Sequence, residues 1–271
     1  DGAQHSIDVC TFILGRDEIG ESVVARLCAK ARAGVRVRLL LDGVGSLMAG
    51  RPRLQEIRAA GGEFTLFVPL LHARLSVRSN LRDHRKLLLT DIGHDDARLW
   101  CGGRNLAAEY FLGDARRTAW HDLSFDLRGP LVAQASTLFE HDWAFARGTP
   151  PPRMPATPAP LLSPAAASAQ LVASGPDQVD DTVYSLLVTA AFRAERRIVL
   201  VTPYFVPDSG LLQALCLAAR RGVVVELLLP AKSNHPMSDV ARHRALRALA
   251  DAGGRIKLAP NMLHAKLAVI D

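Results

Sequence analysis

Short apolar runs alternate along the chain with longer stretches in which apolar residues recur at helical spacing. In the first half, residues 7–12 form a run typical of a buried strand, residues 18–33 have helical spacing, and residues 34–41 form a second strand-like run. Short buried runs separated by amphipathic helices are the pattern of βαβ units in an α/β fold. The pattern therefore predicts mostly parallel or mixed sheets flanked by helices.

The second half repeats this order of elements. A strand-like run at 197–202 precedes a helical stretch at 210–221 and another run at 222–229. In both halves a helix then ends in a glycine pair, at 61–62 and at 253–254, and glycine commonly closes a helix before the next strand. We interpret the two halves as a tandem duplication. Two ordinary α/β domains that share only this common order are the alternative.

Proline and alanine dominate residues 148–164, which is typical of an exposed linker. The predicted organisation is a first half at 1–147, a linker at 148–170 and a second half at 171–271. The duplication further suggests a pseudo-two-fold arrangement with an active site at the interface of the halves.

Composition and charge restrict the classes of partner. The 271 residues are 49% hydrophobic and 22% charged, which excludes a disordered chain. The net charge of +6 favours anionic partners such as phospholipid head groups, nucleic acid or phosphate esters. The four cysteines form no C-x-x-C pair, so neither a disulfide framework nor a zinc site is expected. No apolar run reaches the roughly 18 residues of a membrane-spanning helix, so membrane contact is expected to be peripheral.

One short motif occurs at an equivalent place in each half. It is H-x-K-x4-D, formed by His84, Lys86 and Asp91 and again by His264, Lys266 and Asp271. Residues i and i+2 of a strand point to one face, so each histidine is expected to project beside its lysine. Two of the chain's five lysines fall in this motif, which argues against coincidence.

Paired histidines and lysines suit attack on a phosphodiester. One neutral imidazole is a competent nucleophile, and a second, protonated imidazole can give its proton to the leaving alkoxide. Two ammonium groups stabilise the negative charge of the non-bridging oxygens in the transition state. Each motif would supply half of such a site, and no cofactor is assigned.

Residues after the first motif are candidates for supporting roles. Gly103 allows close backbone approach to a phosphate, and Asn105 can donate to a phosphate oxygen, although a plain turn is the alternative. Asp122 is the first candidate, and Glu109 the second, for the acceptor that orients the imidazole of His84. The acceptor for the second histidine is expected beyond residue 271.

Other acidic residues are interpreted as structural. Asp95 and Asp96 with Gly93 fit a hairpin turn better than a metal site. Asp142 lies with its neighbours on a helix of apolar periodicity, and no residue is assigned to a metal.

Several phrases of the sequence resemble the phospholipase D superfamily, and more narrowly the bacterial cardiolipin synthases. The doubled H-x-K-x4-D is specific for the superfamily, and the phrase that begins at Thr202 points to cardiolipin synthase-like members. The resemblance covers nearly the whole chain and rests on Asp17-Glu18-Ile19-Gly20, Gly34-Val35-Arg36-Val37-Arg38-Leu39-Leu40-Leu41-Asp42, Asp83-His84-Arg85-Lys86 leading to Gly102-Gly103-Arg104-Asn105, Ser174-Gly175-Pro176, Thr202-Pro203-Tyr204-Phe205-Val206-Pro207-Asp208 and Met262-Leu263-His264-Ala265-Lys266.

The resemblance implies a tandem phospholipase D-type fold and a metal-independent ping-pong reaction. By analogy, His84 would attack a phosphatidyl phosphorus to form a phosphohistidine, and His264 would protonate the departing alcohol and then deprotonate the incoming one. With phosphatidylglycerol as donor and acceptor, the products would be cardiolipin and glycerol. The expected location is the bacterial cytoplasmic membrane, bound peripherally through this part of the protein, with any anchor in sequence that precedes residue 1.

The family pattern also includes a second Gly-x-x-Asn-type segment and an acidic partner after the second motif, and neither falls within residues 1–271. The chain by itself is therefore expected to be weakly active or inactive. Residues 71–82 and 232–239 are expected to line the pocket entrance and to influence the choice of acceptor alcohol.

Other functions remain open at this point. Water as acceptor would make the protein a phospholipase D-type hydrolase, and a phosphodiesterase or nuclease of the same superfamily is a further enzymatic alternative. Nucleic acid is not the expected partner, because such nucleases often carry one motif copy and dimerise. A non-catalytic binder of anionic lipid or nucleic acid is the third hypothesis, and oligomeric state is left open.

Overall fold

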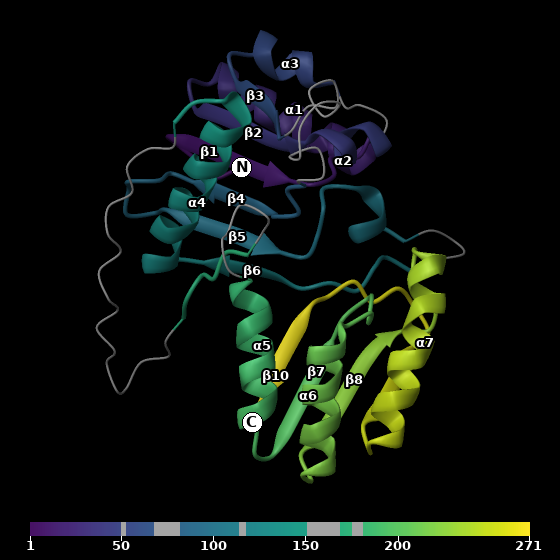
Figure 1. Cartoon of the computed structure of the whole chain (residues 1–271). Coiled ribbons are helices and arrows are strands. Elements are labelled where there is room, and N and C mark those ends of the chain that lie inside the picture. The colour runs from purple at the N-terminus through teal and green to yellow at the C-terminus, as the bar shows by residue number, and fades with distance from the viewer. Residues whose placement is uncertain (50–52, 68–81, 114–117, 151–168, 175–180) are drawn as a thin grey trace. The chain divides into compact units, whose positions relative to one another are not determined.

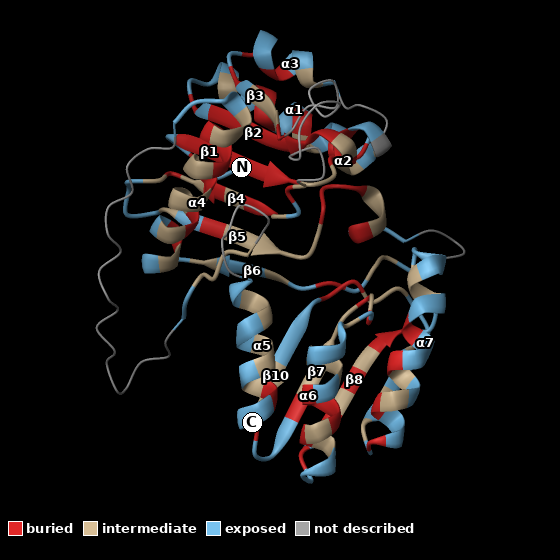
Figure 2. Ribbon diagram, viewed as in Figure 1, coloured by how far each residue is buried: buried red, intermediate tan, exposed pale blue. Residues whose placement is uncertain are grey.

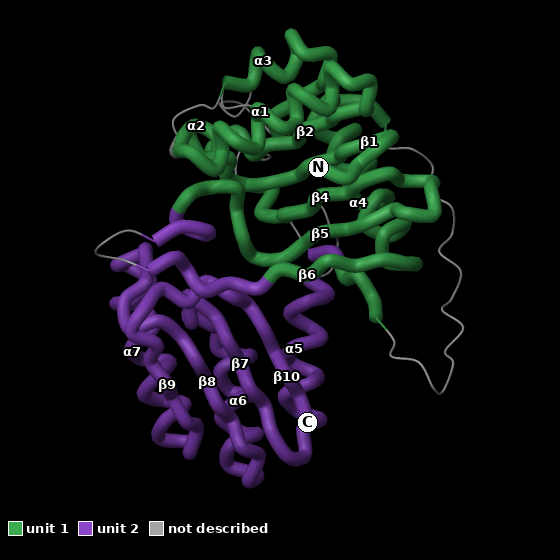
Figure 3. The backbone as a smooth tube through the Cα atoms, turned by 180° about the vertical axis from the view of Figure 1, so that it is seen from behind, with its two compact units in different colours: residues 1–108, 124–172 green, residues 109–123, 173–271 purple. Residues whose placement is uncertain are grey.

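The computed structural model describes residues 1–49, 53–67, 82–113, 118–150, 169–174 and 181–271. These residues fall into two compact units, one of residues 1–108 and 124–172 and the other of residues 109–123 and 173–271 (Figure 3). The second unit thus includes a segment that the sequence places between two strands of the first. Most of the predicted linker, and the predicted pocket segment at 71–82 apart from Arg82, lie outside the described residues.

The first unit is built on a six-stranded mixed sheet in the order β3-β2-β1-β4-β5-β6 (Figure 1). The pairs β1–β2 and β2–β3 are parallel, whereas β4, β5 and β6 are joined by antiparallel pairing. The strands are β1 (Ser6–Thr11), β2 (Arg36–Asp42), β3 (Glu63–Phe67), β4 (Leu87–Thr90), β5 (Arg98–Gly102) and β6 (Ser124–Leu127).

Helices cover both faces of this sheet. Val9 and Leu39 pack with the helices α1 and α3, whereas the next residues along the strands, Cys10 and Leu40, pack with α4. This alternation is the period of two of a β-strand, so the central strands are buried on both sides, as Figure 2 shows for β1 and β2. The helices are α1 (Glu18–Arg32), α2 (Gly43–Met48), α3 (Leu54–Ala59) and α4 (Pro130–Arg147), with a 3-10 turn at Ala108–Tyr110.

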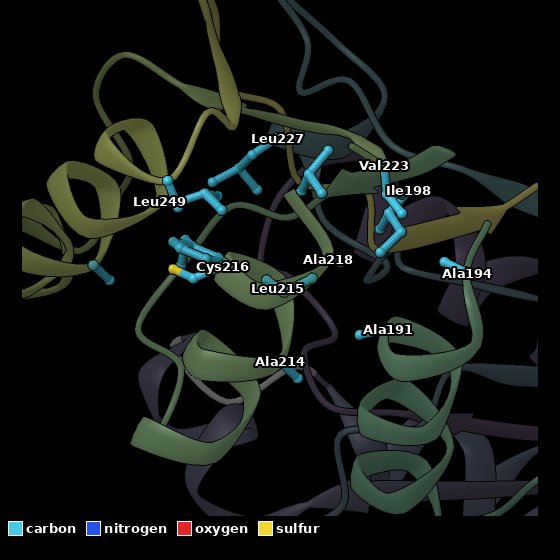
Figure 4. Packing of buried hydrophobic residues seen from close by; sticks show 14 of the residues in the cluster. Ala191, Ala194, Ile198, Ala214, Leu215, Cys216, Ala218, Val223, Leu227 and Leu249 are labelled. Carbon is cyan, nitrogen blue, oxygen red and sulfur yellow. The ribbon is translucent and has the colours of Figure 1, made fainter. Parts of the chain in front are cut away.

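The second unit is a four-stranded sheet in the order β10-β7-β8-β9, with three helices packed against one face (Figures 1 and 3). β7, β8 and β9 are parallel, and β10 pairs antiparallel with β7. Its core joins Ile198 and Leu227 of the sheet to Leu215 and Leu249 of two helices (Figure 4). The elements are α5 (Thr182–Arg193), β7 (Arg197–Val201), α6 (Ser209–Arg220), β8 (Val224–Pro230), α7 (Pro236–Asp251), β9 (Arg255–Ala259) and β10 (Leu267–Ile270).

The two sheets share a topology. The order β3-β2-β1-β4 of the first unit corresponds to β9-β8-β7-β10 of the second, and in both an antiparallel strand that begins directly after a His-x-Lys pairs with the first parallel strand. The predicted α/β class with mixed sheets is confirmed. The ends of the two helices, and of the strands predicted at 7–12, 34–41, 197–202 and 222–229, agree with the observed ones to within two residues, whereas the strands expected to carry the His-x-Lys pairs begin only at Leu87 and Leu267, directly after the lysines.

The glycine pairs end α3 and α7 in the same way. Gly61 and Gly253 have φ angles of 93° and 98°, in the left-handed region that favours glycine. The N–H groups of Gly62 and Gly254 each donate to a carbonyl of the last helical turn at 2.9 Å. A side chain on Gly254 would meet Leu249 Cγ at 2.6 Å. The first glycine therefore supplies the turn and the second supplies space against the helix.

The aspartate that ends the first motif fastens β4 to its neighbour. Asp91 follows β4 with a φ of 53°, and its carboxylate accepts hydrogen bonds from the backbone N–H groups of Gln4, His5 and Ser6 at 2.6–3.0 Å. Ser6 begins β1, the strand with which β4 pairs. Burial alone would raise the pKa of Asp91, but the three donors outweigh burial and hold that pKa below its ordinary value.

Asp271 occupies the same place in the second unit. It has a φ of 51°, and its carboxylate accepts from the N–H groups of Glu195, Arg196 and Arg197 at 2.8–3.0 Å, where β7 begins. These hydrogen bonds lower the pKa of Asp271 to about 2. The motif groups both aspartates with the catalytic residues, but each lies at the end of its strand opposite the histidine and binds backbone amides. The structure corrects that prediction and gives Asp91 and Asp271 a structural role.

Replacing Asp91 is expected to destabilise the first unit. Asp91→Ala removes the acceptor of three backbone N–H groups and places alanine at a positive φ, so we expect the free energy of unfolding to fall by about 2–3 kcal/mol. Asp91→Asn keeps one acceptor oxygen and tolerates the left-handed region, so its loss is expected to be smaller. Urea unfolding followed by circular dichroism measures both variants, and equal losses would contradict the fastening role.

The same carboxylates are expected to make stability depend on acid. Both have a folded-state pKa below the unfolded value of ~3.9, so their stabilisation is complete above about pH 4. It is lost as the pH falls through the folded-state pKa, which is about 2 for Asp271. Thermal unfolding between about pH 5 and pH 2 should therefore show a steeper loss in the wild type than in Asp91→Asn, whose amide does not titrate. Parallel curves for the two proteins would assign acid sensitivity to other groups.

Candidate functional site

The first half-site lies at the start of β4 in the first unit. His84 is exposed and stacks on the ring of Phe12, with 4.1 Å between ring centroids. Lys86 is only 8% exposed, and its ammonium donates to the backbone oxygen of His84. The same ammonium lies 5.6 Å from the centroid of the Phe12 ring. The histidine and lysine of the first motif are therefore neighbours, although both precede β4 and neither lies in a strand as expected.

The buried carboxylate of Asp83 helps to hold the backbone of this half-site in place. Asp83 Oδ1 accepts from the N–H of Arg85 at 2.9 Å, and its own N–H donates to Asp42 Oδ2 at 3.0 Å. The thiol of Cys10 donates to Asp83 Oδ2 at 3.1 Å. Burial, and then the charge of Asp83, raise the pKa of Cys10 well above its ordinary value, so this cysteine stays a thiol. Asp42 and Asp83 stand in phrases that carry the family resemblance, but no local pattern assigned them a role in the half-site.

Arg85, the residue between the histidine and the lysine of the first motif, has a structural role. The side chain of Arg85 meets Asp142 of α4 at 3.0 and 3.1 Å. The Asp142 side chain is 2% exposed, so this is a buried charge pair. The structural interpretation of Asp142 is confirmed.

Hydrogen bonds hold the segment after β5 next to the segment that follows β1. The side-chain oxygen of Asn105 accepts from the N–H of Ile13 at 3.1 Å, and Leu106 pairs with the same stretch of backbone. The oxygen of Asn105 is used in this way. The amide nitrogen is the atom of this side chain that can donate to a phosphate. Gly103 lies in the bend just before it. Their role in phosphate binding stays a prediction.

Residues 91–97 form the turn of the β4–β5 hairpin, which confirms the interpretation of Asp95, Asp96 and Gly93. Within the described part of the chain, no group of three or more His, Cys, Asp or Glu residues is placed to hold a metal ion.

The second half-site is buried in the second unit. His264 is 8% exposed, and its Nδ1 lies 2.7 Å from Oδ2 of Asp122, whose side chain is 1% exposed. The ammonium of Lys266 lies 2.9 Å from both ring nitrogens and donates to the backbone oxygen of His264 at 2.6 Å. A carboxylate at Nδ1 fixes the tautomer that leaves Nε2 for chemistry and stabilises the imidazolium when it forms. Histidine, lysine and carboxylate are thus assembled in one place.

This pairing corrects the predicted partner of Asp122. The sequence assigns Asp122 to His84 and expects the acceptor for His264 beyond residue 271, but the structure places Asp122 on His264. The reason is the position of residues 118–123, where the backbone of His121 lies beside the second motif. The N–H of His121 donates to Met262 O at 2.9 Å, and the N–H of His264 donates to His121 O at 2.7 Å. Glu109, the second candidate, contributes its backbone oxygen to the N–H of Trp120 at 2.8 Å.

Aromatic rings surround His264. The centroids of Tyr110, Trp120 and Tyr204 lie 5.2, 5.6 and 6.4 Å from that of the imidazole. Tyr110 and Trp120 come from the same segment as Asp122, and Tyr204 follows β7. The rings restrict access of water and fix the plane of the imidazole. No signal in the sequence identified Tyr110 or Trp120 as part of the site.

Tyr204 also ties the site to the loop after β8. Its hydroxyl donates to Asn234 Oδ1, and its ring lies 5.0 Å from that of His235. Burial raises the pKa of Tyr204 to about 12, which outweighs the opposite effect of the hydrogen bond to Asn234, so the hydroxyl stays protonated. Part of the predicted pocket segment at 232–239 therefore lies beside the second half-site, and its influence on the acceptor stays a prediction.

The hydropathy of the helices bears on membrane contact. Across the residues that the structure describes, no helix combines the length and the apolar character needed to cross a bilayer.

Comparisons with known proteins agree with this geometry. The family described as "Cardiolipin synthase, PLD-like domain" matches residues 1–143 and 187–271. A cardiolipin synthase of Geobacillus kaustophilus is 34% identical over 274 residues, and cardiolipin synthase 1 of Bacillus anthracis is 33% identical over 279 residues. These alignments cover 99% of this chain but 53% and 54% of those proteins, so the chain spans about half the length of these curated relatives.

A solved structure with a similar fold is phosphatidylserine synthase from Haemophilus influenzae. It matches with a TM-score of 0.66 and 14% sequence identity, over 100% of this chain and 71% of that one. At this identity the likeness concerns the fold alone. The family match includes both His-x-Lys motifs and most of the elements that position them, and the chain belongs to the PLD-like domain family of cardiolipin synthase.

Proposed function

We propose that this chain carries the catalytic residues of a phosphatidyltransferase that makes cardiolipin and glycerol from two molecules of phosphatidylglycerol. The observation that carries the proposal is the buried His264 with Asp122 at Nδ1 and Lys266 beside the ring. The matching His84 and Lys86, on the equivalent strand of the other sheet, support it. Membership of the cardiolipin synthase family supports the choice of substrate.

The proposed reaction has two transfers. In the first, a nitrogen of His84 attacks the phosphorus of phosphatidylglycerol, a P–N bond forms, and the bond to the glycerol oxygen breaks. The protonated His264 gives its proton to that oxygen, and glycerol leaves. In the second, His264 takes the proton from a hydroxyl of another phosphatidylglycerol, whose oxygen attacks the phosphohistidine and releases His84. The proposal requires both motifs to act on one phosphorus.

The charges of the site suit these steps. Lys86 and Lys266 each carry an ammonium next to their histidine and would stabilise the non-bridging oxygens as negative charge develops on them. Asp122 supports the cationic form of His264 that the first step needs. Asn105 and Gly103 would contact the phosphate. No step draws on a metal or another cofactor.

The proposed reaction also indicates where the protein acts. The donor and acceptor are both lipids, so the reaction takes place at a membrane surface, and we propose the bacterial cytoplasmic membrane. The positive net charge of +6 favours a surface rich in anionic lipid.

The transferase can be tested in the full-length product that contains these 271 residues, alongside the chain itself. We expect cardiolipin from phosphatidylglycerol in mixed micelles with a chelator present, detected by mass spectrometry. His84→Ala and His264→Ala are each expected to lower turnover by about 10²–10⁴-fold or more, since each removes a proton-transfer group or the nucleophile. Retained turnover in either variant would reject the two-histidine mechanism.

Two other results would change the proposed function. Phosphatidic acid as sole product would keep the mechanism and make the enzyme a phospholipase. Cleavage of DNA that requires His84, without any lipid product, would favour a nuclease.

The role of Asp122 gives a separate test. Asp122→Asn preserves size but presents an amide to His264 Nδ1, so the turnover number is expected to fall by about 10²–10⁴-fold with little change in KM. Asp126→Asn is the matched control, because Asp126 is exposed on β6 and pairs with the exposed Arg98. Normal turnover in Asp122→Asn, or an equal loss in the control, would remove Asp122 from the mechanism.

A further inference from the structure

The start of α7 exposes two apolar side chains, one in its first turn and one at the beginning of its second. Met237 is 86% exposed and Val240 is 72% exposed, and they are the two most exposed large apolar residues in the part of the chain that the structure describes. Neighbouring exposed apolar side chains are candidates for an interaction surface. In Figure 1 the start of α7 lies where β8 ends, at the end of the sheet from which the second motif starts.

The outward direction of these side chains is fixed by what α7 buries. Arg242, Ala245 and Leu249 lie against the unit, with exposed fractions of 7% or less. Met237, Val240 and Arg244 stand at i, i+3 and i+7, which is the opposite stripe of the helix. The helix therefore holds one face in the core and presents the other to its surroundings.

Polar contacts hold the start of α7 in place. The guanidinium of Arg242 donates to the backbone oxygens of Pro230 and Ala231 at 2.9 and 2.8 Å. Asp239 pairs with Arg242 at 3.2 Å, and its other oxygen accepts from the N–H of Ser233 at 2.9 Å. These contacts hold the loop after β8 against the start of α7. The two apolar side chains therefore project from a fixed base.

This base adjoins the second half-site. His235 precedes the helix and lies beside Tyr204, whose ring is 6.4 Å from that of His264. Further exposed apolar residues lie within two positions of the rings around His264: Val206 at 54%, Phe111 at 41% and Leu112 at 37%. Exposed apolar residues therefore lie close in sequence to the rings that surround His264.

The charged residues on this surface have one sign. From residue 232 to residue 247 the exposed charged side chains are Lys232, Arg244 and Arg247. The carboxylate in this stretch, Asp239, is half-buried and paired with Arg242. Apolar side chains that project between basic ones match the interface of a bilayer, where the apolar groups enter the acyl boundary and the basic groups meet anionic head groups.

We infer that the loop 231–235 and the exposed face of α7 as far as Arg247 form a bilayer-docking surface that inserts Met237 and Val240 into an anionic membrane next to the second half-site. This inference extends the proposed function, since it states how a lipid substrate would meet the site, but its observations are independent of turnover. The fully exposed side chains and flanking cations distinguish this surface from a flat apolar protein interface.

Binding of the purified chain to vesicles tests the surface without catalysis. Flotation compares vesicles of phosphatidylcholine alone with vesicles that also contain phosphatidylglycerol. The wild type is expected to bind the second kind, and Met237→Glu combined with Val240→Glu is expected to bind at least about tenfold more weakly. Glutamate near the start of a helix is favourable at position 237, and both positions are exposed, so this variant is expected to fold, which circular dichroism checks.

Matched variants separate the apolar and basic contributions. Leu186→Glu combined with Phe192→Glu changes two apolar residues of α5 that are 57% and 52% exposed, and it is expected to bind almost as the wild type does. Arg244→Gln and Arg247→Gln are each expected to weaken binding to the anionic vesicles by about fivefold, with no effect on neutral ones.

The outcomes distinguish docking from the proposed function. Equal binding by the wild type and the Met237/Val240 variant would overturn the inference, as would Met237-dependent self-association in place of vesicle binding. Selective loss of vesicle binding supports it. If that loss occurs in a protein whose full-length form shows no lipid turnover, the docking surface stands and the transferase fails. Micellar turnover that survives in a variant unable to bind vesicles supports both.

Discussion

The pairing of one antiparallel strand with the first parallel strand is the constraint on which each half-site depends. β4 pairs with β1 and β10 pairs with β7, and the motif histidine and lysine stand directly before these strands. The motif aspartate fixes the far end by accepting from the backbone where the neighbouring strand begins. A motif of eight residues therefore carries both its chemistry and the fastening that places it, which is why histidine, lysine and aspartate recur together.

Buried charged groups support the first half-site, and each has a polar partner. Arg85 meets Asp142 across one face of the sheet, while Asp83 joins the N–H of Arg85 to Asp42 at the end of β2. An unpaired charge at these depths would be strongly destabilising, so the pairs must form together with the packing of α4 and the sheet. Such pairs add little net stability, but they permit few alternative positions for the backbone at His84.

The second half-site depends on a segment distant in sequence. Residues 109–123 leave the first unit after Ala108 and supply Asp122, Tyr110 and Trp120 to His264, before Ser124 returns to β6. Removing or altering this segment would affect the chemistry of one unit and the strand order of the other. The loop after β8, which carries Asn234 and His235, contacts Tyr204, one of the rings around His264.

The sequence by itself determined the elements, the repeat and the reactive groups. Strand and helix periods are local, so residues 6–11 and 197–201 could be recognised as equivalent strands, and glycine pairs could be read as helix ends because they act within one turn. Only the tertiary structure decided which carboxylate meets which histidine. Asp122 is 142 residues from His264, and no local pattern reports a contact between segments so far apart. The same limit applies to Asp91 and Asp271, because three backbone amides have no side-chain identity that a sequence motif could reveal.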